Sequence, residues 1–311
     1  MNNDLNSCDP QELIIRESFK KDYKLSCPVI DDNDVFNKSI MIAELQQEWI
    51  NYKDMVDRIE GNLDNYRKQI RHTVTNHLSH VKGFDKLTPE KNTNKYTNKY
   101  TGPRTCLRDE VCGKKLISID LIKANYQSMR HLNPKFVLDT QNYQELITKF
   151  TQEKCMIECR MLRQLIFGFL KPEVQVAVQK TIIGTVIDQI IKECGDETLL
   201  IEQLTNDEVV FSINSNEKDY TKILNKINDM ITKLPYQLRL TEFSVEKIKN
   251  SFNEPWFIKK FNDDRYKIVG VHVRYLFQVY NHLHQLENEK KDLWWRERGR
   301  LCALLDQEEF I

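Results

Sequence analysis

Three acidic side chains beside apolar segments offer the clearest chemistry in the chain. Asp120 follows the apolar run 115–119, and Asp207 and Glu208 lie in a polar turn between two further apolar runs. A short polar turn between strand-like runs predicts a β-hairpin that displays its carboxylates. Carboxylate oxygens suit Mg²⁺, and nucleotidyl transfer uses two such ions roughly 3.5–4 Å apart. The three residues are therefore candidate metal ligands. By themselves they are weak signals, because an Asp at the end of a strand is more often the N-cap of the helix that follows.

The surrounding pattern predicts the elements that would position these residues. Apolar runs predict strands at 115–119, 199–204, 209–213 and 237–243, and helical spacing predicts helices at 121–130, 141–168, 173–192 and 218–233. The order strand, helices, hairpin, helix, strand is typical of an α+β fold in which helices cover one face of an antiparallel sheet.

A long helix is predicted before this region, within residues 40–82. Apolar side chains recur there in alternating steps of four and three, at Leu45, Trp49, Tyr52, Val56, Ile59, Leu63, Tyr66 and Ile70. This spacing places them on one stripe of a helix. We favour a packing helix over a dimerising coiled coil, because a Trp and two Tyr do not suit a tight two-stranded seam. Residues 45–70 are nevertheless a candidate contact for a protein partner, and Gly61 is a potential weak point.

Composition limits the remaining classes of function. The chain of 311 residues has 46 basic and 46 acidic side chains, so no net charge attracts nucleic acid or anionic lipid, and any such binding needs a local patch. We find no signal peptide and no apolar run of the roughly 18–20 residues that span a bilayer. We expect a soluble intracellular protein of the cytoplasm or nucleus, without a membrane partner, and a virus or mobile element as one source of its gene.

The eight cysteines are expected to be reduced thiols. Neither Cys106 with Cys112 nor Cys155 with Cys159 forms the pattern of tight pairs that structural zinc sites favour. His272, His282 and His284 have no carboxylate or Cys at ligand spacing, so we interpret them as structural.

Five segments follow one another along the chain: LISIDLIKANY (116–126), RMLRQLIFG (160–168), TIIG (181–184), QLTNDEVVF (203–211) and WFIKKFNDDRYKIVGVHVRY (256–275). In order and relative placement they resemble motifs in the palm of family-B DNA polymerases. Each segment alone matches its motif only weakly. The shared order of the five segments makes the resemblance more specific. It covers residues 113 to about 280.

The resemblance implies a minimal palm-type nucleic-acid polymerase that uses two Mg²⁺ or Mn²⁺ ions, nucleoside triphosphates and nucleic acid. The implied catalytic metal ligands are Asp120 and Asp207, with Glu208 as a further metal ligand. The candidate nucleotide-binding residues are Tyr126, Arg160, Arg163, Gln164 and Gly168, and the candidate nucleic-acid-binding residues are Lys259, Lys260, Lys267 and Arg274. The two arginines lie three residues apart, a spacing at which their guanidinium groups can grip phosphates.

The departures from the family pattern are informative. Thr205 replaces the first Asp of the hairpin motif, and Tyr126 falls one residue later than the family's aromatic residue. About 110 residues precede the first motif, without the acidic strand motif of a proofreading nuclease. We therefore expect an extended lead-in (1–38), a long helical region (39–89), a basic linker loop (90–112), a palm-like domain (113–250) with short fingers at about 131–168, and a small helical thumb-like region (251–311).

Two other functions fit the same residues. Thr205 and the short fingers also suit a palm that no longer catalyses and serves as a scaffold or nucleic-acid-binding subunit of a larger complex. A simple helical nucleic-acid-binding protein is the third alternative. Its one direct sign is the basic loop 91–100, which is also typical of a solvated linker. Trp294 and Trp295, beside several arginines, could stack on nucleic acid or pack in a core.

Overall fold

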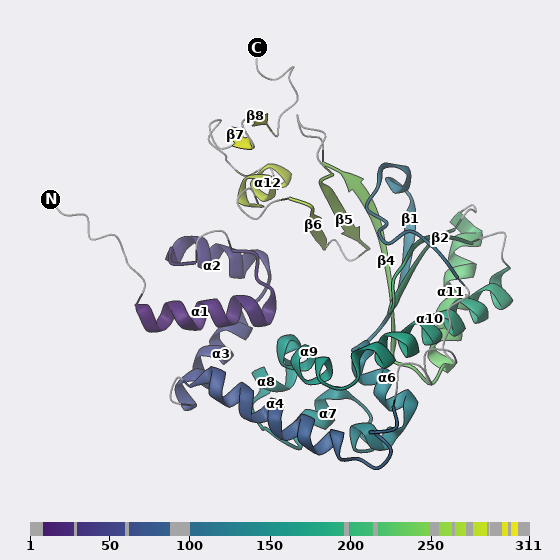
Figure 1. The fold of residues 1–311 in the computed structure, drawn as a ribbon. Coiled ribbons are helices and arrows are strands. Elements are labelled where there is room, and N and C mark those ends of the chain that lie inside the picture. Colours follow the sequence, from purple (N-terminus) through teal and green to yellow (C-terminus); the bar gives the residue numbers. More distant parts are fainter. Residues whose placement is uncertain are drawn as a thin grey trace. The chain divides into compact units, whose positions relative to one another are not determined.

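The structure is a computed structural model that describes residues 9–27, 30–59, 62–87, 100–195, 199–213, 217–248, 255–262, 265–271, 276–284, 286, 294–297 and 300–303. The chain forms two compact units (Figure 1). The helical unit consists of Met1–Thr97 and Lys123–Gln179, and the sheet unit consists of Asn98–Ile122 and Lys180–Ile311. The chain therefore leaves the sheet unit directly after the first strand and returns to it within a helix.

The helical unit is built from short helices around one apolar core (Figure 1). Its elements are α1 (Pro10–Tyr23), α2 (Asn33–Ile42), α3 (Gln46–Arg58), α4 (Leu63–Ser79), α6 (Ala124–Leu132), the 3₁₀ turn η2 (Pro134–Val137), α7 (Tyr143–Thr148), α8 (Lys154–Glu158) and α9 (Arg160–Gly168). Helix α1 occupies the lead-in that was predicted to be extended. The stretch 141–168, which was predicted to be helical, contains three short helices, α7, α8 and α9.

The apolar stripe predicted for the long helix is present, but the helix is not continuous. The chain breaks after α2, where Glu44 has a φ of +55°, and again between α3 and α4. Five stripe residues are buried and the other three pack against the same core. The stripe therefore stabilises its own unit and is not exposed for the protein partner predicted at 45–70. Gly61 lies outside the described residues.

The sheet unit contains a six-stranded antiparallel sheet in the order β2-β3-β1-β4-β5-β6. Its elements are η1 (Asp109–Val111), β1 (Lys115–Leu121), β2 (Leu199–Leu204), β3 (Glu208–Ile213), α11 (Glu217–Lys233), β4 (Leu238–Lys247), β5 (Phe257–Phe261), β6 (Tyr266–Val269) and α12 (Leu276–Leu283), with a separate pair, β7 (Trp294–Glu297) and β8 (Arg300–Ala303). Helix α10 (Pro172–Cys194) contributes its residues from Lys180 onward. These elements confirm the predicted α+β class.

The two faces of the sheet differ because antiparallel partners place their side chains on the same face. On the helix face, Tyr220 of α11 donates a hydrogen bond from its hydroxyl to Glu242 (3.0 Å), and Val279 of α12 packs with Ile258. Figure 1 shows α10 and α11 beside the strands β1, β2 and β4. The other face, which we call the carboxylate face, bears Asp120 and its cross-strand partner Glu208.

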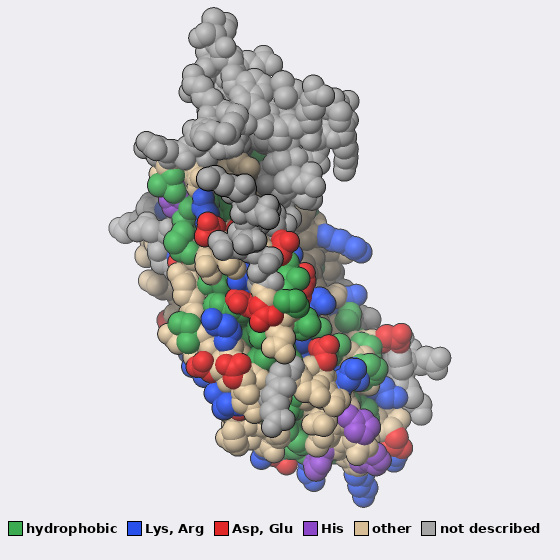
Figure 2. Space-filling model, turned by 90° about the vertical axis from the view of Figure 1, so that its left-hand side faces the viewer, with side chains coloured by type: hydrophobic (Ala, Val, Ile, Leu, Met, Phe, Trp, Pro, Cys, Tyr) green, Lys and Arg blue, Asp and Glu red, His purple; other side chains and the backbone are tan. Residues whose placement is uncertain are grey.

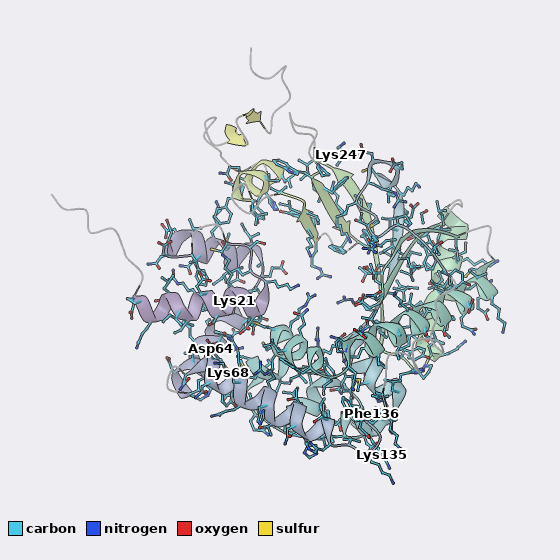
Figure 3. The ribbon with its side chains drawn as sticks, viewed as in Figure 1. Lys21, Asp64, Lys68, Lys135, Phe136 and Lys247 are labelled. Carbon is cyan, nitrogen blue, oxygen red and sulfur yellow. The ribbon has the colours of Figure 1, made fainter. Side chains whose placement is uncertain are left out.

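A strap, residues 104–113, covers the apolar part of the carboxylate face. Its Cys106 and Val111 pack against a cluster that includes Leu116, Val210 and Phe243. Two adjacent residues in the middle of the strap make polar contacts with different strands, β2 and β4. Arg108 pairs with the buried Glu202 of β2, and Asp109 accepts a hydrogen bond from Lys247 (2.8 Å), which Figure 3 labels. The polar part of the face, which includes the carboxylates, lies beyond this cluster.

Two predicted regions differ from the structure. The described part of the predicted linker is packed against the sheet unit. Before the strap, Pro103 accepts a hydrogen bond from Leu204 N–H of the edge strand β2 (2.7 Å), and Tyr100 donates to Asp188 of α10 (2.5 Å). The repeat at 91–99 lies outside the described residues. The predicted helical thumb is also wrong in part, because β5 and β6 extend the sheet. Within the described ranges, no helix combines the length and apolar character needed to cross a bilayer.

Candidate functional site

The acidic residues predicted to converge lie at the same end of adjacent strands. Asp120 of β1 is the direct cross-strand partner of Glu208 in β3. The backbone N–H of Leu121 donates to the carbonyl oxygen of Asp207 at 2.8 Å. All three acidic residues are half-buried. The β2–β3 hairpin thus brings Asp207 beside the end of β1, as the sequence pattern predicted.

Thr205 shapes the turn of this hairpin. Its backbone N–H donates to the carbonyl of Glu208 (2.9 Å), and its hydroxyl oxygen accepts from the N–H of Glu208 (3.1 Å). The same hydroxyl donates to Oδ1 of Asp207 at 3.2 Å. Thr is well suited to such local backbone bonds. Thr205 therefore orients the carboxylate of Asp207.

Glu208 is held by two side-chain donors. Ser118, which is buried, donates to Oε1 (2.6 Å), and Gln203 donates to Oε2 (2.8 Å). Gln203 is oriented in turn, since its Oε1 accepts from the backbone N–H of Cys106 in the strap (2.9 Å). Each carboxylate oxygen has a second lone pair, so metal contact remains chemically available. The bonds nevertheless favour a positioning role for Glu208 over the metal-binding role predicted for it.

Asp120 has a cationic neighbour that the sequence did not predict. Arg239 is its cross-strand partner in β4, and their side chains form an ion pair at 2.7 Å. The Asp120 side chain is 25% exposed and that of Arg239 is 65% exposed. Burial raises the pKa of Asp120. Arg239 opposes that rise, and the charges of Glu208 and Asp207 add to it, so the net pKa lies above the ordinary value.

The donor set fits Mg²⁺ or Mn²⁺ bound with the help of a substrate. Mg²⁺ usually keeps several waters and takes one or two carboxylates together with substrate phosphates. Asp120 lies near the end of β1, and Asp207 lies in the turn directly before β3, so two carboxylates that could supply hard oxygen ligands lie at the same end of the sheet. Among the described residues, no group of three or more His, Cys, Asp or Glu side chains is arranged to hold an ion. The site therefore suits an ion that arrives with phosphates better than a permanently held one.

We expect Asp120→Asn to stabilise the protein at neutral pH. A carboxyl whose pKa is raised on folding makes its stabilising contribution below its unfolded pKa and loses it as pH rises through the folded value. Asn cannot ionise, so the variant avoids that loss. Loss of the exposed pair with Arg239 offsets only a little of the gain. Thermal unfolding should show a higher Tm than wild type at pH 7 and no increase near about pH 3, below the usual Asp pKa. A lower Tm at pH 7 would contradict this.

The predicted nucleic-acid-binding lysines separate onto the two faces of the sheet. Lys259 and Lys267 are cross-strand partners on the carboxylate face, and Lys259 lies 4.5 Å from the ring centroid of Phe243. Lys260 points to the helix face and pairs with Glu246 at 2.7 Å. The prediction for Lys260 is therefore wrong for any strand bound over the carboxylates. Arg274 lies outside the described residues.

The predicted nucleotide-binding residues belong to the helical unit. Arg160, Gln164 and Gly168 are exposed on α9, and a side chain at Gly168 would meet open space. Arg163 is half-buried, with its guanidinium carbon 5.6 Å from the ring centroid of Tyr143. Nucleotide binding by these α9 residues therefore stays a prediction, and their exposure is compatible with it.

Tyr126 is different, and its predicted role is wrong. The side chain is 1% exposed in the core of the helical unit, where its hydroxyl donates to the carbonyl of Thr140 (2.6 Å). A ring packed inside a core cannot form the floor of a sugar pocket.

Three functional neighbours were missed from sequence: Arg239, Ser118 and Gln203. Each is polar within an apolar alternating segment, which is a usable signal, but their contacts depend on strand register. On the face drawn in Figure 2, acidic and basic side chains are interspersed, in keeping with the neutral composition.

No protein-family model matches this chain, and no curated protein sequence matches it. The likeness to a family-B palm therefore depends on the motifs and on the geometry described above.

Proposed function

We propose that this protein is a metal-dependent nucleotidyltransferase, a minimal palm-type nucleic-acid polymerase. The observation that supports this most strongly is the pairing of β1 with the β2–β3 hairpin, which places Asp120 and Asp207 together at one end of an antiparallel sheet. Two carboxylates on adjacent strands meet the main requirement of phosphoryl transfer, which is positioning and neutralisation of charge.

Each residue of the site has a separate task in this proposal. Asp120 and Asp207 hold the divalent ions, which when bound supply positive charge to the phosphates of the nucleotide. Thr205 orients Asp207, and Glu208 braces β1 through Ser118. The exposed Arg239 forms an ion pair with Asp120 and opposes the rise in the pKa of that carboxyl, and a bound cation would take the place of its guanidinium group. Lys259 and Lys267 lie on the same face and would contact phosphates of a nucleic-acid strand.

A primer-extension assay on denaturing gels tests the proposal. Purified protein is incubated with primed DNA and RNA templates, all four nucleotides of each sugar type, and either Mg²⁺ or Mn²⁺. We expect metal-dependent addition to at least one primer, abolished by a chelator. Because a protein hydroxyl can also prime synthesis, radiolabelled nucleotide transfer to the protein itself is measured in parallel. Absence of incorporation with every template, primer and metal would overturn the proposal.

The ion pair between Asp120 and Arg239 favours a second candidate function. The guanidinium group of Arg239 already supplies a positive charge where a metal ion would bind. Thr205 has no carboxylate, so the hairpin turn has one fewer acidic ligand to offer a metal ion. Both features suit a palm-like scaffold or nucleic-acid-binding subunit that has lost catalysis. Titration with Mn²⁺ in the presence of a nucleoside triphosphate separates the two candidates. Saturable binding of Mn²⁺ and nucleotide that requires Asp207 would exclude the scaffold. A protein that binds nucleic acid but neither metal nor nucleotide would support the scaffold.

A further inference from the structure

The helix face of the sheet contains a cavity of about 390 Å³. Strands β1 and β4 line it on one side and the first turns of α11 on the other, with Lys115, Tyr220, Thr221, Leu224, Glu242 and Ser244 among its lining residues. Ligand pockets in proteins span roughly 300–1,000 Å³, so its size suits one small molecule. The strand positions of these side chains place them on the face opposite Asp120.

Opposite charges lie at separate positions along this cavity. Lys115 and Ser244 are direct cross-strand partners, and Glu242 lies two residues from Ser244 on the same face of β4. Two residues along a strand correspond to roughly 7 Å. One position therefore offers an ammonium group and a hydroxyl, which suit an anion, and the other offers a carboxylate, which suits hydrogen-bond donors.

An aromatic ring joins the two positions. Tyr220 is 6% exposed, and its hydroxyl holds Oε2 of Glu242 at 3.0 Å. The ammonium group of Lys115 lies 5.3 Å from the centroid of the same ring. Tyr220 thus orients the carboxylate before any ligand binds, and Lys115 is exposed enough to turn toward an anion. Leu224 adds an apolar contact beside the ring.

We infer that this cavity binds a guanine nucleotide with one phosphate. Lys115 and Ser244 would take the phosphate, and Glu242 would take the base, because guanine presents two adjacent N–H donors that match a carboxylate. In an α-amino acid the ammonium and carboxylate groups are bonded to the same carbon atom. They lie too close together to contact Glu242 and Lys115 at the same time. This inference is independent of the proposed function, since the cavity shares no side chain with the carboxylate site.

Calorimetric titration of the full chain with GMP, in EDTA to exclude metal, tests the inference. We expect saturation at one site, with GMP bound more tightly than CMP or UMP. Lys115→Met should weaken GMP binding at least tenfold and leave guanosine binding unchanged. Glu242→Gln, which can still accept from Tyr220, should remove the preference for guanine. Lys222→Met is the matched control, because Lys222 is an exposed lysine of α11 outside the cavity lining.

The inference would be overturned by no saturation at millimolar GMP, by wild-type affinity in Lys115→Met, or by loss of GMP binding in Asp120→Asn. Asp120→Asn separates this site from the carboxylate site. Retention of GMP binding in that variant supports the cavity on the helix face, and loss of binding assigns GMP to the carboxylates instead. Failure of primer extension would leave these binding results unaffected, so the two proposals can fail separately.

Discussion

Asp207→Asn is expected to abolish nucleotide incorporation while leaving the fold intact. The substitution keeps the size of the side chain and its acceptor for Thr205, but removes the negative charge that would hold a cation. Loss of one preorganised electrostatic group typically lowers kcat by about 10²–10³-fold, and loss of a metal ligand should cost at least as much. The rate of primer extension, or of nucleotide transfer to the protein, measures the effect.

Asp229→Asn provides the matched control for this prediction. Asp229 is an exposed carboxylate of α11 in the same unit, so its loss changes net charge equally without touching the site. We expect wild-type activity from Asp229→Asn and equal circular dichroism spectra for both variants. Full activity in a folded Asp207→Asn variant would exclude catalysis at these carboxylates, whatever the activity of the control.

The sheet was predictable from sequence to the extent that its signals are local. The apolar run before Asp120 and the polar turn at Asp207 both appear in short windows, and β2 has the predicted bounds 199–204. The adjacency of Asp120 to the hairpin did not follow from such signals, because β1 pairs with β3 and not with β2, the next strand along the chain; only the resemblance implied it. Periodicity could not predict the register between paired strands. The pairing of Asp120 with Arg239 depends on how β1 and β4 align.

The helical unit was less predictable because long-range packing decides it. The stripe of residues 45–70 was visible in the sequence, but periodicity could not predict what it packs against, such as the contacts of Trp49 with Phe19 of α1 and Phe36 of α2. Tyr126 shows the same limit. Its place in a motif indicated a ligand, whereas its ring completes an aromatic cluster with Tyr143 and Phe167.

Arg67→Met is expected to destabilise the helical unit by about 3–5 kcal/mol, the usual cost of breaking a buried ion pair from one side. Arg67 of α4 is 5% exposed and pairs with Asp22 of α1, which is 3% exposed. The hydroxyl of Tyr52 donates to the same Asp22 oxygen at 2.6 Å, and Arg67 also contacts that hydroxyl. Without the guanidinium group, Asp22 stays buried with one donor, since its Oδ1 has no partner within the described structure. Urea denaturation measures the decrease in the free energy of unfolding. Hydrogen exchange of peptides from 63–79 then tests whether the decrease affects α4.

The double variant Asp22→Asn with Arg67→Met tests the cause. If an uncompensated buried charge produces the loss, removing both charges should restore much of the stability, so the two substitutions should be strongly non-additive. Lys68→Met is the matched control on the same helix. Lys68 is exposed and is labelled in Figure 3, so its loss should change stability by less than about 0.5 kcal/mol. Additive effects of Asp22→Asn and Arg67→Met would show that lost packing, and not charge, destabilises the unit.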